Sequence, residues 1–138
     1  MTPHWEHFEH QADIGVRGYG NSIEQAFEQA ALAMMAIMTD ISLINAQQKV
    51  NISCADHDPA LLLTDWLNAL IFEIATHKLL FCEFDVAISD GQLTATARGE
   101  TIDVAKHQPA VEIKGATFTE LAVKQVNDQW MAQCVVDV

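Results

Sequence analysis

The spacing of the apolar residues changes near residue 79 of this 138-residue chain. Before that point, two segments carry apolar residues at intervals of three and four, as one face of a helix does. After it, the apolar residues fall in short β-favouring segments that are separated by turn residues. This pattern predicts one α+β domain over residues 1–138, with two amphipathic helices packed against a mostly antiparallel β-sheet.

Both expected helices have recognisable ends. Ser22, followed three residues later by Gln25, forms a capping box, and helical spacing continues from there to Met38. Asp58 is a typical N-cap residue, and a proline follows it at the first helical position. We expect the second helix to end near residues 77–78, whose basic character suits a helix C-terminus.

The other ordered segments are expected to be strands. Asp90-Gly91 is a strong two-residue hairpin signal, and Asn127-Asp128 marks a second turn. Pro109 indicates a loop between these two strand pairs. The expected strands are residues 4–18, 49–55, 80–89, 92–98, 111–126 and 129–136.

The charge balance excludes some kinds of partner. Seven Lys and Arg against 19 Asp and Glu give a net charge of −12. Affinity for nucleic acid comes mainly from cations that neutralise phosphates, so direct binding of RNA or DNA is disfavoured, as is binding to anionic lipid. Most of the excess acid is expected to serve solubility, and some of it to meet a basic protein surface.

The same composition indicates a cytoplasmic protein. The longest apolar run, residues 30–38, is too short to cross a bilayer, and the N-terminus lacks the features of a signal peptide. The three cysteines, Cys54, Cys82 and Cys134, are widely separated and form no zinc-binding motif. We expect them to be buried, reduced thiols.

No motif for nucleophilic catalysis or phosphate binding is present in the sequence. His4, His7 and His10 are spaced by three, but on a strand His7 faces the side opposite to the other two. A histidine-based metal site is therefore disfavoured, and hydrogen-bonded or solvated histidines are the simpler interpretation.

Two aspartates interrupt apolar segments at opposite ends of the chain. Asp13 lies between Ala12 and Ile14, and Asp137 lies between Val136 and Val138. A charged group in a core strand costs several kcal/mol unless it is paired or bound to a metal. A hard divalent cation would remove the repulsion between them, and the carboxylate of Val138 would add an oxygen. The alternative, two exposed aspartates at strand edges, remains open at this point.

Several motifs, in order along nearly the whole chain, resemble those of the archease family. They are His10-Gln11-Ala12-Asp13-Ile14 with Gly18, the capped helix at Ser22, Leu62-Leu63 with Asp65-Trp66-Leu67, Arg98-Gly99-Glu100, Glu112-Ile113-Lys114-Gly115-Ala116-Thr117, and Val135-Val136-Asp137-Val138. Gln11 and Gly115 depart from the threonine and alanine that are common in the family, and neither replaces a proposed ligand.

The resemblance implies a specific role. Archeases are small acidic cytoplasmic proteins that assist the tRNA-splicing RNA ligase. They promote guanylylation of that enzyme with GTP and so permit multiple turnover, without being ligases themselves. Family members carry a metal site, which implies a divalent cation here, calcium first and magnesium or manganese as alternatives. Its ligands would be Asp13, Asp137 and the main-chain oxygen of Val138.

The resemblance also assigns a functional role to Lys114, as the residue that contacts the partner or its nucleotide. From the residues alone, a solvated lysine at a sheet edge would be the simpler interpretation. His10 and Glu100 are candidates for the surroundings of the metal.

Two other functions remain to be weighed. A stand-alone metal-dependent hydrolase would need a base near the metal, for which Glu100 or His10 would serve. A plain acidic chaperone would bind basic proteins without any metal.

Overall fold

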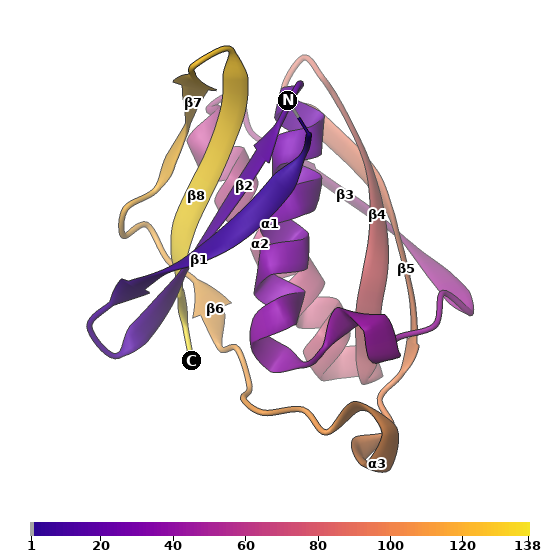
Figure 1. Cartoon of the computed structure of the whole chain (residues 1–138). Coiled ribbons are helices and arrows are strands. Elements are labelled where there is room, and N and C mark those ends of the chain that lie inside the picture. Colours follow the sequence, from indigo (N-terminus) through magenta and orange to yellow (C-terminus); the bar gives the residue numbers. More distant parts are fainter. Residues whose placement is uncertain (1) are drawn as a thin grey trace.

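A computed structural model describes residues 2–138. Figure 1 shows two helices that lie between two antiparallel β-sheets. Helix α1 (Ile23–Met38) contacts strands of both sheets, and helix α2 (Pro59–His77) does so as well. The predicted α+β fold is confirmed, and its antiparallel strands divide into two sheets.

The larger sheet joins the two ends of the chain. Its strands are β1 (His4–His10), β2 (Asp13–Gly20), β6 (Gly115–Ala116), β7 (Ala122–Val126) and β8 (Gln129–Asp137). The strand order is β1-β2-β8-β6, and β7 pairs with the first part of β8. Strand β8 therefore lies between the N-terminal hairpin and the short strands β6 and β7.

The smaller sheet comes from the middle of the chain. It consists of β3 (Gln48–Ala55), β4 (Leu79–Ser89) and β5 (Gln92–Thr101), in the order β3-β5-β4. The hairpin between β4 and β5 turns at Asp90 and Gly91, both of which have positive φ angles, as predicted.

The helix ends agree with the capping signals in the sequence. The Ser22 hydroxyl accepts a hydrogen bond from the backbone N–H of Gln25, and the Asp58 carboxylate accepts one from the N–H of Ala60. The two helices meet in the core, where the indole Nε1 of Trp66 donates to the carbonyl of Phe27 at 3.1 Å. Burying apolar side chains from both helices and both sheets is the main stabilising term of such a fold.

Two strand predictions are wrong. Residues 4–18 are not one strand but a hairpin, because Gln11 adopts a left-handed conformation with φ 53° and reverses the chain. Residues 111–126 are also not one strand. Residues 111–114 are irregular, since Ile113 turns its side chain into the core, and residues 117–121 form a loop between β6 and β7.

Two short helices were not anticipated. A 3₁₀ helix spans Ile41–Leu43, and helix α3 spans Val104–His107. The carboxylate of Asp103 caps α3 by accepting from the backbone N–H groups of Ala105 and Lys106. Such single-turn helices leave no periodic apolar pattern, so hydrophobic spacing does not predict them.

Helix α2 is both long and apolar. A stretch of 18 residues within it has a mean hydropathy of 1.2, so the helix is long and apolar enough, by length and composition alone, to cross a membrane. In this structure eight of its residues are buried in the protein, so much of its apolar character is used in packing. The three cysteines form no disulfide; Cys134 is buried, and Cys54 and Cys82 are half-buried.

Candidate functional site

The fold brings the two predicted aspartates to neighbouring strands. Strand β2 begins at Asp13 and strand β8 ends at Asp137, and these strands pair in an antiparallel manner with Ile14 opposite Val136. Continuing that register by one residue places Asp13 opposite Asp137. Residues directly opposite in an antiparallel pair point to the same face, with Cβ atoms about 4.5–5.5 Å apart.

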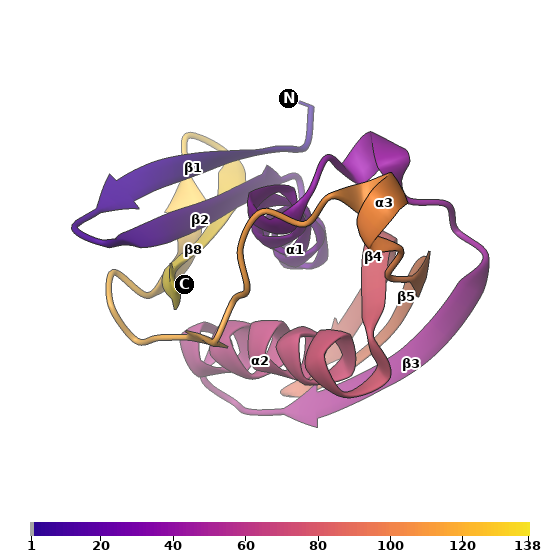
Figure 2. The ribbon, with the colours of Figure 1, turned by 90° about the horizontal axis from the view of Figure 1, so that it is seen from below.

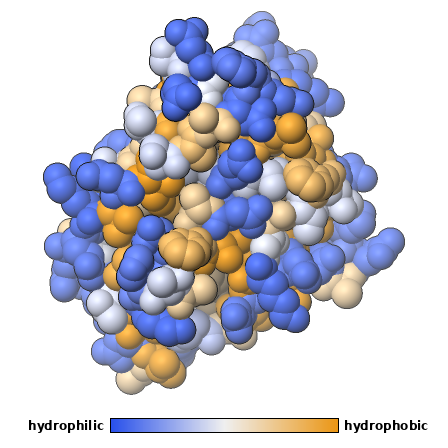
Figure 3. All heavy atoms as spheres, turned by 180° about the vertical axis from the view of Figure 1, so that it is seen from behind, coloured by the Kyte–Doolittle hydropathy of each residue, from blue (hydrophilic) through white to orange (hydrophobic). Residues whose placement is uncertain are grey.

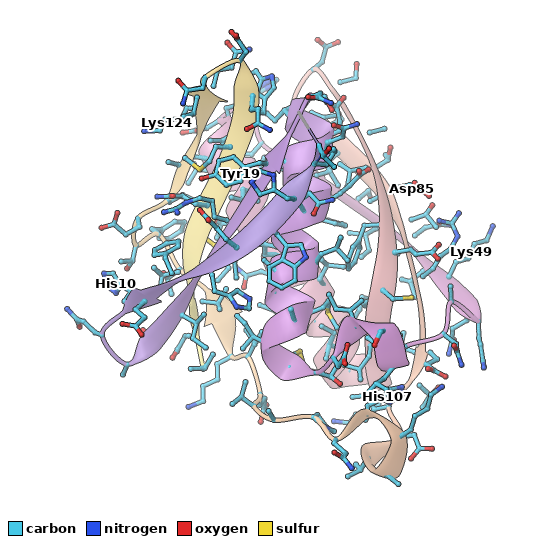
Figure 4. All side chains as sticks on the ribbon, viewed as in Figure 1. His10, Tyr19, Lys49, Asp85, His107 and Lys124 are labelled. Atoms are coloured by element: carbon cyan, nitrogen blue, oxygen red, sulfur yellow. The ribbon has the colours of Figure 1, made fainter. Side chains whose placement is uncertain are left out.

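A residue from each neighbouring strand extends this pair into a row across the sheet. His10 on β1 is opposite Asp13, and Gly115 on β6 is opposite Asp137. We call these four residues the acidic row. The row lies at the end of the sheet where the β1–β2 hairpin turns and where the C-terminus emerges, as the position of His10 in Figure 4 and of the C-terminus in Figure 1 shows.

The polar groups of the row have few protein partners. Within residues 2–138, neither Asp13 nor Asp137 takes part in an ion pair or a side-chain hydrogen bond. The Nδ1 atom of His10 is buried and has no hydrogen-bond partner in the same part of the chain. Two facing carboxylates destabilise a sheet, so this arrangement is unfavourable for the protein by itself.

Lys114 lies next to the acidic row. Its backbone N–H donates to the carbonyl of Asp137 at 2.7 Å, while its side chain is exposed and forms no ion pair with any residue from 2 to 138. Lys114 was predicted on a strand, but β6 begins one residue later, at Gly115. The backbone of Lys114 nevertheless lies directly beside Asp137.

The position of β6 depends on a residue that the sequence did not single out. Asn68 on α2 accepts from the backbone N–H of Ala116 at 2.9 Å, and its amide donates to the carbonyl of the same residue at 3.4 Å. An asparagine within the apolar segment Trp66–Leu70 was the available signal, because a polar side chain there needs a specific partner. By holding β6, Asn68 also fixes the backbone at Lys114.

Glu100, a predicted neighbour of the metal, lies in the other sheet. One oxygen of its carboxylate accepts from the Asn45 backbone N–H at 2.7 Å, from the Lys106 Nζ at 2.7 Å and from the His107 Nε2 at 3.0 Å. The hydrogen bond from Lys106, followed by those from Asn45 and His107, lowers the pKa of Glu100 to about 2. The structure therefore does not bring Glu100 to the acidic row.

His107 is fully buried in this second cluster. Its Nδ1 accepts from the backbone N–H of Asp103 at 2.9 Å, so its Nε2 carries the proton that is donated to Glu100. Figure 4 shows His107 on α3 and His10 at the β1–β2 turn, in separate parts of the molecule. The Glu100 cluster holds α3 against β5 and is a structural element.

The other N-terminal histidines have their own contacts. The ring of His4 stacks on Tyr19, with centroids 4.6 Å apart, and the Nε2 of His7 lies 2.7 Å from the carbonyl oxygen of Ala33. Within the described residues, no three His, Cys, Asp or Glu side chains are grouped closely enough to hold a metal ion. A metal at the acidic row would thus need main-chain oxygens in addition to the two aspartates.

The donor groups at the row suit a hard cation. Two carboxylates, together with the main-chain carbonyl of Val138, are oxygen ligands of the kind that calcium, magnesium and manganese prefer. Beside Asp13, the buried Nδ1 of His10 is a further polar atom to which the described part of the chain offers no hydrogen-bond partner. The residues present therefore fit an oxygen-liganded divalent cation.

Comparison with known proteins relates the whole chain to one family. The model of the archease protein family matches residues 5–138. The archease of Pyrococcus furiosus is 37% identical over 97% of this chain and 98% of its own length, and that of Sulfolobus acidocaldarius is 36% identical over the same shares. The names of both relatives state the family and no more specific function.

Two solved structures share the fold. The solution structure of protein 1598 from Methanobacterium thermoautotrophicum superimposes with a TM-score of 0.84 and 34% identity, covering 97% of this chain and 98% of that one. The crystal structure of a Thermotoga maritima protein, described as an archease and possible chaperone, gives a TM-score of 0.64 at 21% identity, covering 95% and 94% of the two chains. The second likeness shows the fold alone.

Proposed function

The chain belongs to the archease protein family, and on that premise we propose that it is an accessory protein that activates the tRNA-splicing RNA ligase. It would promote guanylylation of the ligase with GTP and so allow multiple turnover, without catalysing ligation. The observation that carries this proposal is the juxtaposition, at one end of the sheet, of Asp13, Asp137 and Lys114. These three groups come from distant parts of the sequence.

In this proposal the carboxylates of Asp13 and Asp137, with the main-chain carbonyl of Val138, hold a divalent cation. Calcium is the first candidate, with magnesium and manganese as alternatives. When bound, the cation would supply the positive charge that offsets the repulsion between the two aspartates. His10, whose Nδ1 has no hydrogen-bond partner among residues 2–138, would orient Asp13 from the neighbouring strand.

Lys114 would act on the partner. Its exposed ammonium group, free of any ion pair within residues 2–138, would bind a phosphate or carboxylate of the ligase or of its nucleotide. The net charge of −12 supports contact with a basic protein surface rather than with RNA, which the ligase would hold. The proposed site of action is the cytoplasm.

For the alternative of a stand-alone hydrolase, only one of the two candidate bases lies near the acidic row. Glu100 lies in the other sheet, with its carboxylate held by Lys106 and His107, so it is not available to activate a water at the acidic row. Only His10 remains of that pair. The alternative of a chaperone without a metal is distinguished by calorimetry, since it predicts no binding of calcium or magnesium by the wild-type protein.

A turnover assay of the purified cognate ligase with GTP tests the proposal. Wild-type protein is expected to raise the number of ligation events per ligase, and Asp13→Asn, Asp137→Asn and Lys114→Met are expected to lose most of that stimulation. Matched controls are Asp128→Asn in the β7–β8 turn and Lys124→Met on β7. Both residues are exposed, and Figure 4 shows Lys124 at the end of the sheet opposite to His10. Equal stimulation by the site variants and the controls would refute the assignment of the site.

A further inference from the structure

A cavity is lined in part by the residues that directly precede Lys114. It has a volume of about 380 Å³ and lies between the C-terminal ends of α1 and α2 and residues 108–114, the segment that connects α3 to β6. We call this segment the strap. The cavity is lined mainly by apolar side chains, including Met38, Ile71, Ile74, Ile102, Val111 and Ile113. This size and lining are typical of sites that receive a small ligand or a large side chain.

The strap is attached to the rest of the fold at three points. The Thr39 hydroxyl donates to the carbonyl of His107, the residue directly before the strap, at 2.6 Å. The Ala110 N–H donates to the carbonyl of Met38 at 2.7 Å, and the Lys114 N–H donates to the carbonyl of Asp137 at 2.7 Å. The wall of the cavity and Lys114 thus belong to one anchored segment, which Figure 2 shows passing between α1 and α2 on its way to the C-terminal strands.

Two opposite charges stand at the rim. Lys78, at the end of α2, and Glu112, on the strap, both line the cavity and are both exposed. Neither takes part in an ion pair among residues 2–138, whereas Arg17, Arg98 and Lys106 are all paired with acids. This combination suits a ligand with an apolar group for the cavity, an acidic group that pairs with Lys78 and a basic group that pairs with Glu112.

A peptide segment matches this charge pattern better than a small apolar molecule does. A hydrocarbon ligand would leave both rim charges without a partner, and an apolar carboxylate would pair with Lys78 but meet Glu112. Val111, which lines the cavity, is itself 39% exposed, so apolar surface reaches the mouth of the cavity. From the rear, where α2 faces the viewer, Figure 3 shows hydrophobic side chains reaching the surface among hydrophilic ones.

We propose that the cavity under the strap receives an apolar side chain from a segment of the protein partner that also carries an acidic and a basic residue. This contact would dock the partner next to Lys114 and the acidic row. The inference rests on the proposed function in so far as it names the RNA ligase as that partner. A small free ligand and a second copy of this chain are the competing occupants.

The test measures ligase stimulation as a function of the concentration of this protein. Val111→Asp places a charge in the mouth of the cavity, and Val104→Asp, at a 70% exposed position on α3, is the matched control. Val111→Asp is expected to raise the concentration for half-maximal stimulation at least about tenfold, the effect of losing about 1.4 kcal/mol of apolar contact. Val104→Asp is expected to match the wild type.

A second set of variants tests the cavity without placing an aspartate at position 111, where a charge can disturb folding instead of binding. Val111→Ser shortens the apolar wall without adding charge, and Lys78→Glu reverses the rim cation; both are expected to shift the half-maximal concentration in the same direction. Thermal unfolding of each variant verifies that it is folded. A photo-crosslinking residue at Val111 is expected to label the purified ligase, and the same residue at Val104 is not.

Each outcome has a distinct meaning. If wild-type protein fails to stimulate the ligase, the proposed function is refuted, and the assignment of the ligase to the cavity falls with it. If wild type stimulates but the Val111 and Lys78 variants behave like Val104→Asp, the cavity inference is refuted while the proposed function stands. Self-association that Val111→Asp abolishes, with unchanged ligase stimulation, would assign the cavity to a second copy instead.

Discussion

Removing one of the two facing carboxylates, as in Asp13→Asn, is expected to stabilise the metal-free protein while abolishing its stabilisation by calcium. The two side chains lie opposite each other on paired strands, and no cation from residues 2–138 neutralises either one. Asparagine has nearly the same shape as aspartate, so the substitution removes a charge and little else. Stability and function are then expected to move in opposite directions at this position.

The size of the effect follows from the separation of the charges. Two unit charges about 5.5 Å apart repel by about 3 kcal/mol at an effective dielectric constant of 20 and by about 0.8 kcal/mol at 80. Because Asp137 is exposed and Asp13 is half-buried, the lower end of this range applies. We expect a gain of about 1 kcal/mol in the free energy of unfolding, which for a chain of this length raises the Tm by about 3 °C.

Thermal unfolding in EDTA at low ionic strength, and again in excess calcium, measures both effects. In EDTA, Asp13→Asn is expected to unfold above the wild type, and the difference should shrink in 1 M salt, where screening acts over about 3 Å. At a calcium concentration 100 times Kd the wild type gains about 2.7 kcal/mol, so the order reverses. Asp128→Asn serves as the control. An Asp13→Asn protein that is no more stable than wild type in EDTA, or that calcium stabilises equally, would refute the reasoning.

Three further predictions concern the scaffold. Gly18→Ala is expected to destabilise the protein by about 1–3 kcal/mol in urea unfolding, because the new Cβ would lie 2.3 Å from backbone atoms of α1; Gly115→Ala, whose Cβ would approach no heavy atom closer than 3.7 Å, is the control. The hydrogen bond from Lys106 holds the pKa of Glu100 at about 2, below its ordinary value of 4.5, so the stability it contributes is present above pH 4.5 and is lost as the pH falls towards 2. Unfolding measured from pH 6 to pH 2 is expected to show a shallower loss in Glu100→Gln than in wild type, and parallel curves would contradict this. Burial raises the pKa of the Cys134 thiol to about 12, so maleimide labelling followed by mass spectrometry should modify it only on unfolding.

The agreement between sequence and structure is best where local interactions decide the outcome. The N-caps at Ser22 and Asp58 are where the sequence predicts them, because a capping side chain bonds to a backbone N–H only two or three residues away. The turn at Asp90-Gly91 is a similar case. Each of these features needs only a short stretch of chain to be favourable.

The wrong strand predictions occur where contacts between residues distant in sequence determine the backbone conformation. Gln11 adopts a positive φ although glycine or asparagine would be the usual residue there, and the pairing of β1 with β2 supports that conformation. The predicted strand over residues 111–126 is interrupted because Thr117 and Thr119 bond to the backbone of Val135 across a loop. Periodicity within the segment contains no information about such contacts.

The candidate site also combines features that are visible in the sequence with features that only the tertiary structure determines. Asp13, Asp137 and Lys114 are identifiable in the sequence, since a charged residue between apolar ones is visible from its immediate neighbours and from the family motifs. That the two aspartates face each other depends on the register between strands from opposite ends of the chain, where a shift of one residue would turn one of them to the other face. The same long-range pairing places Glu100 in a separate cluster and leaves a cavity under the strap, because both depend on side chains that meet only when the sheets and helices pack.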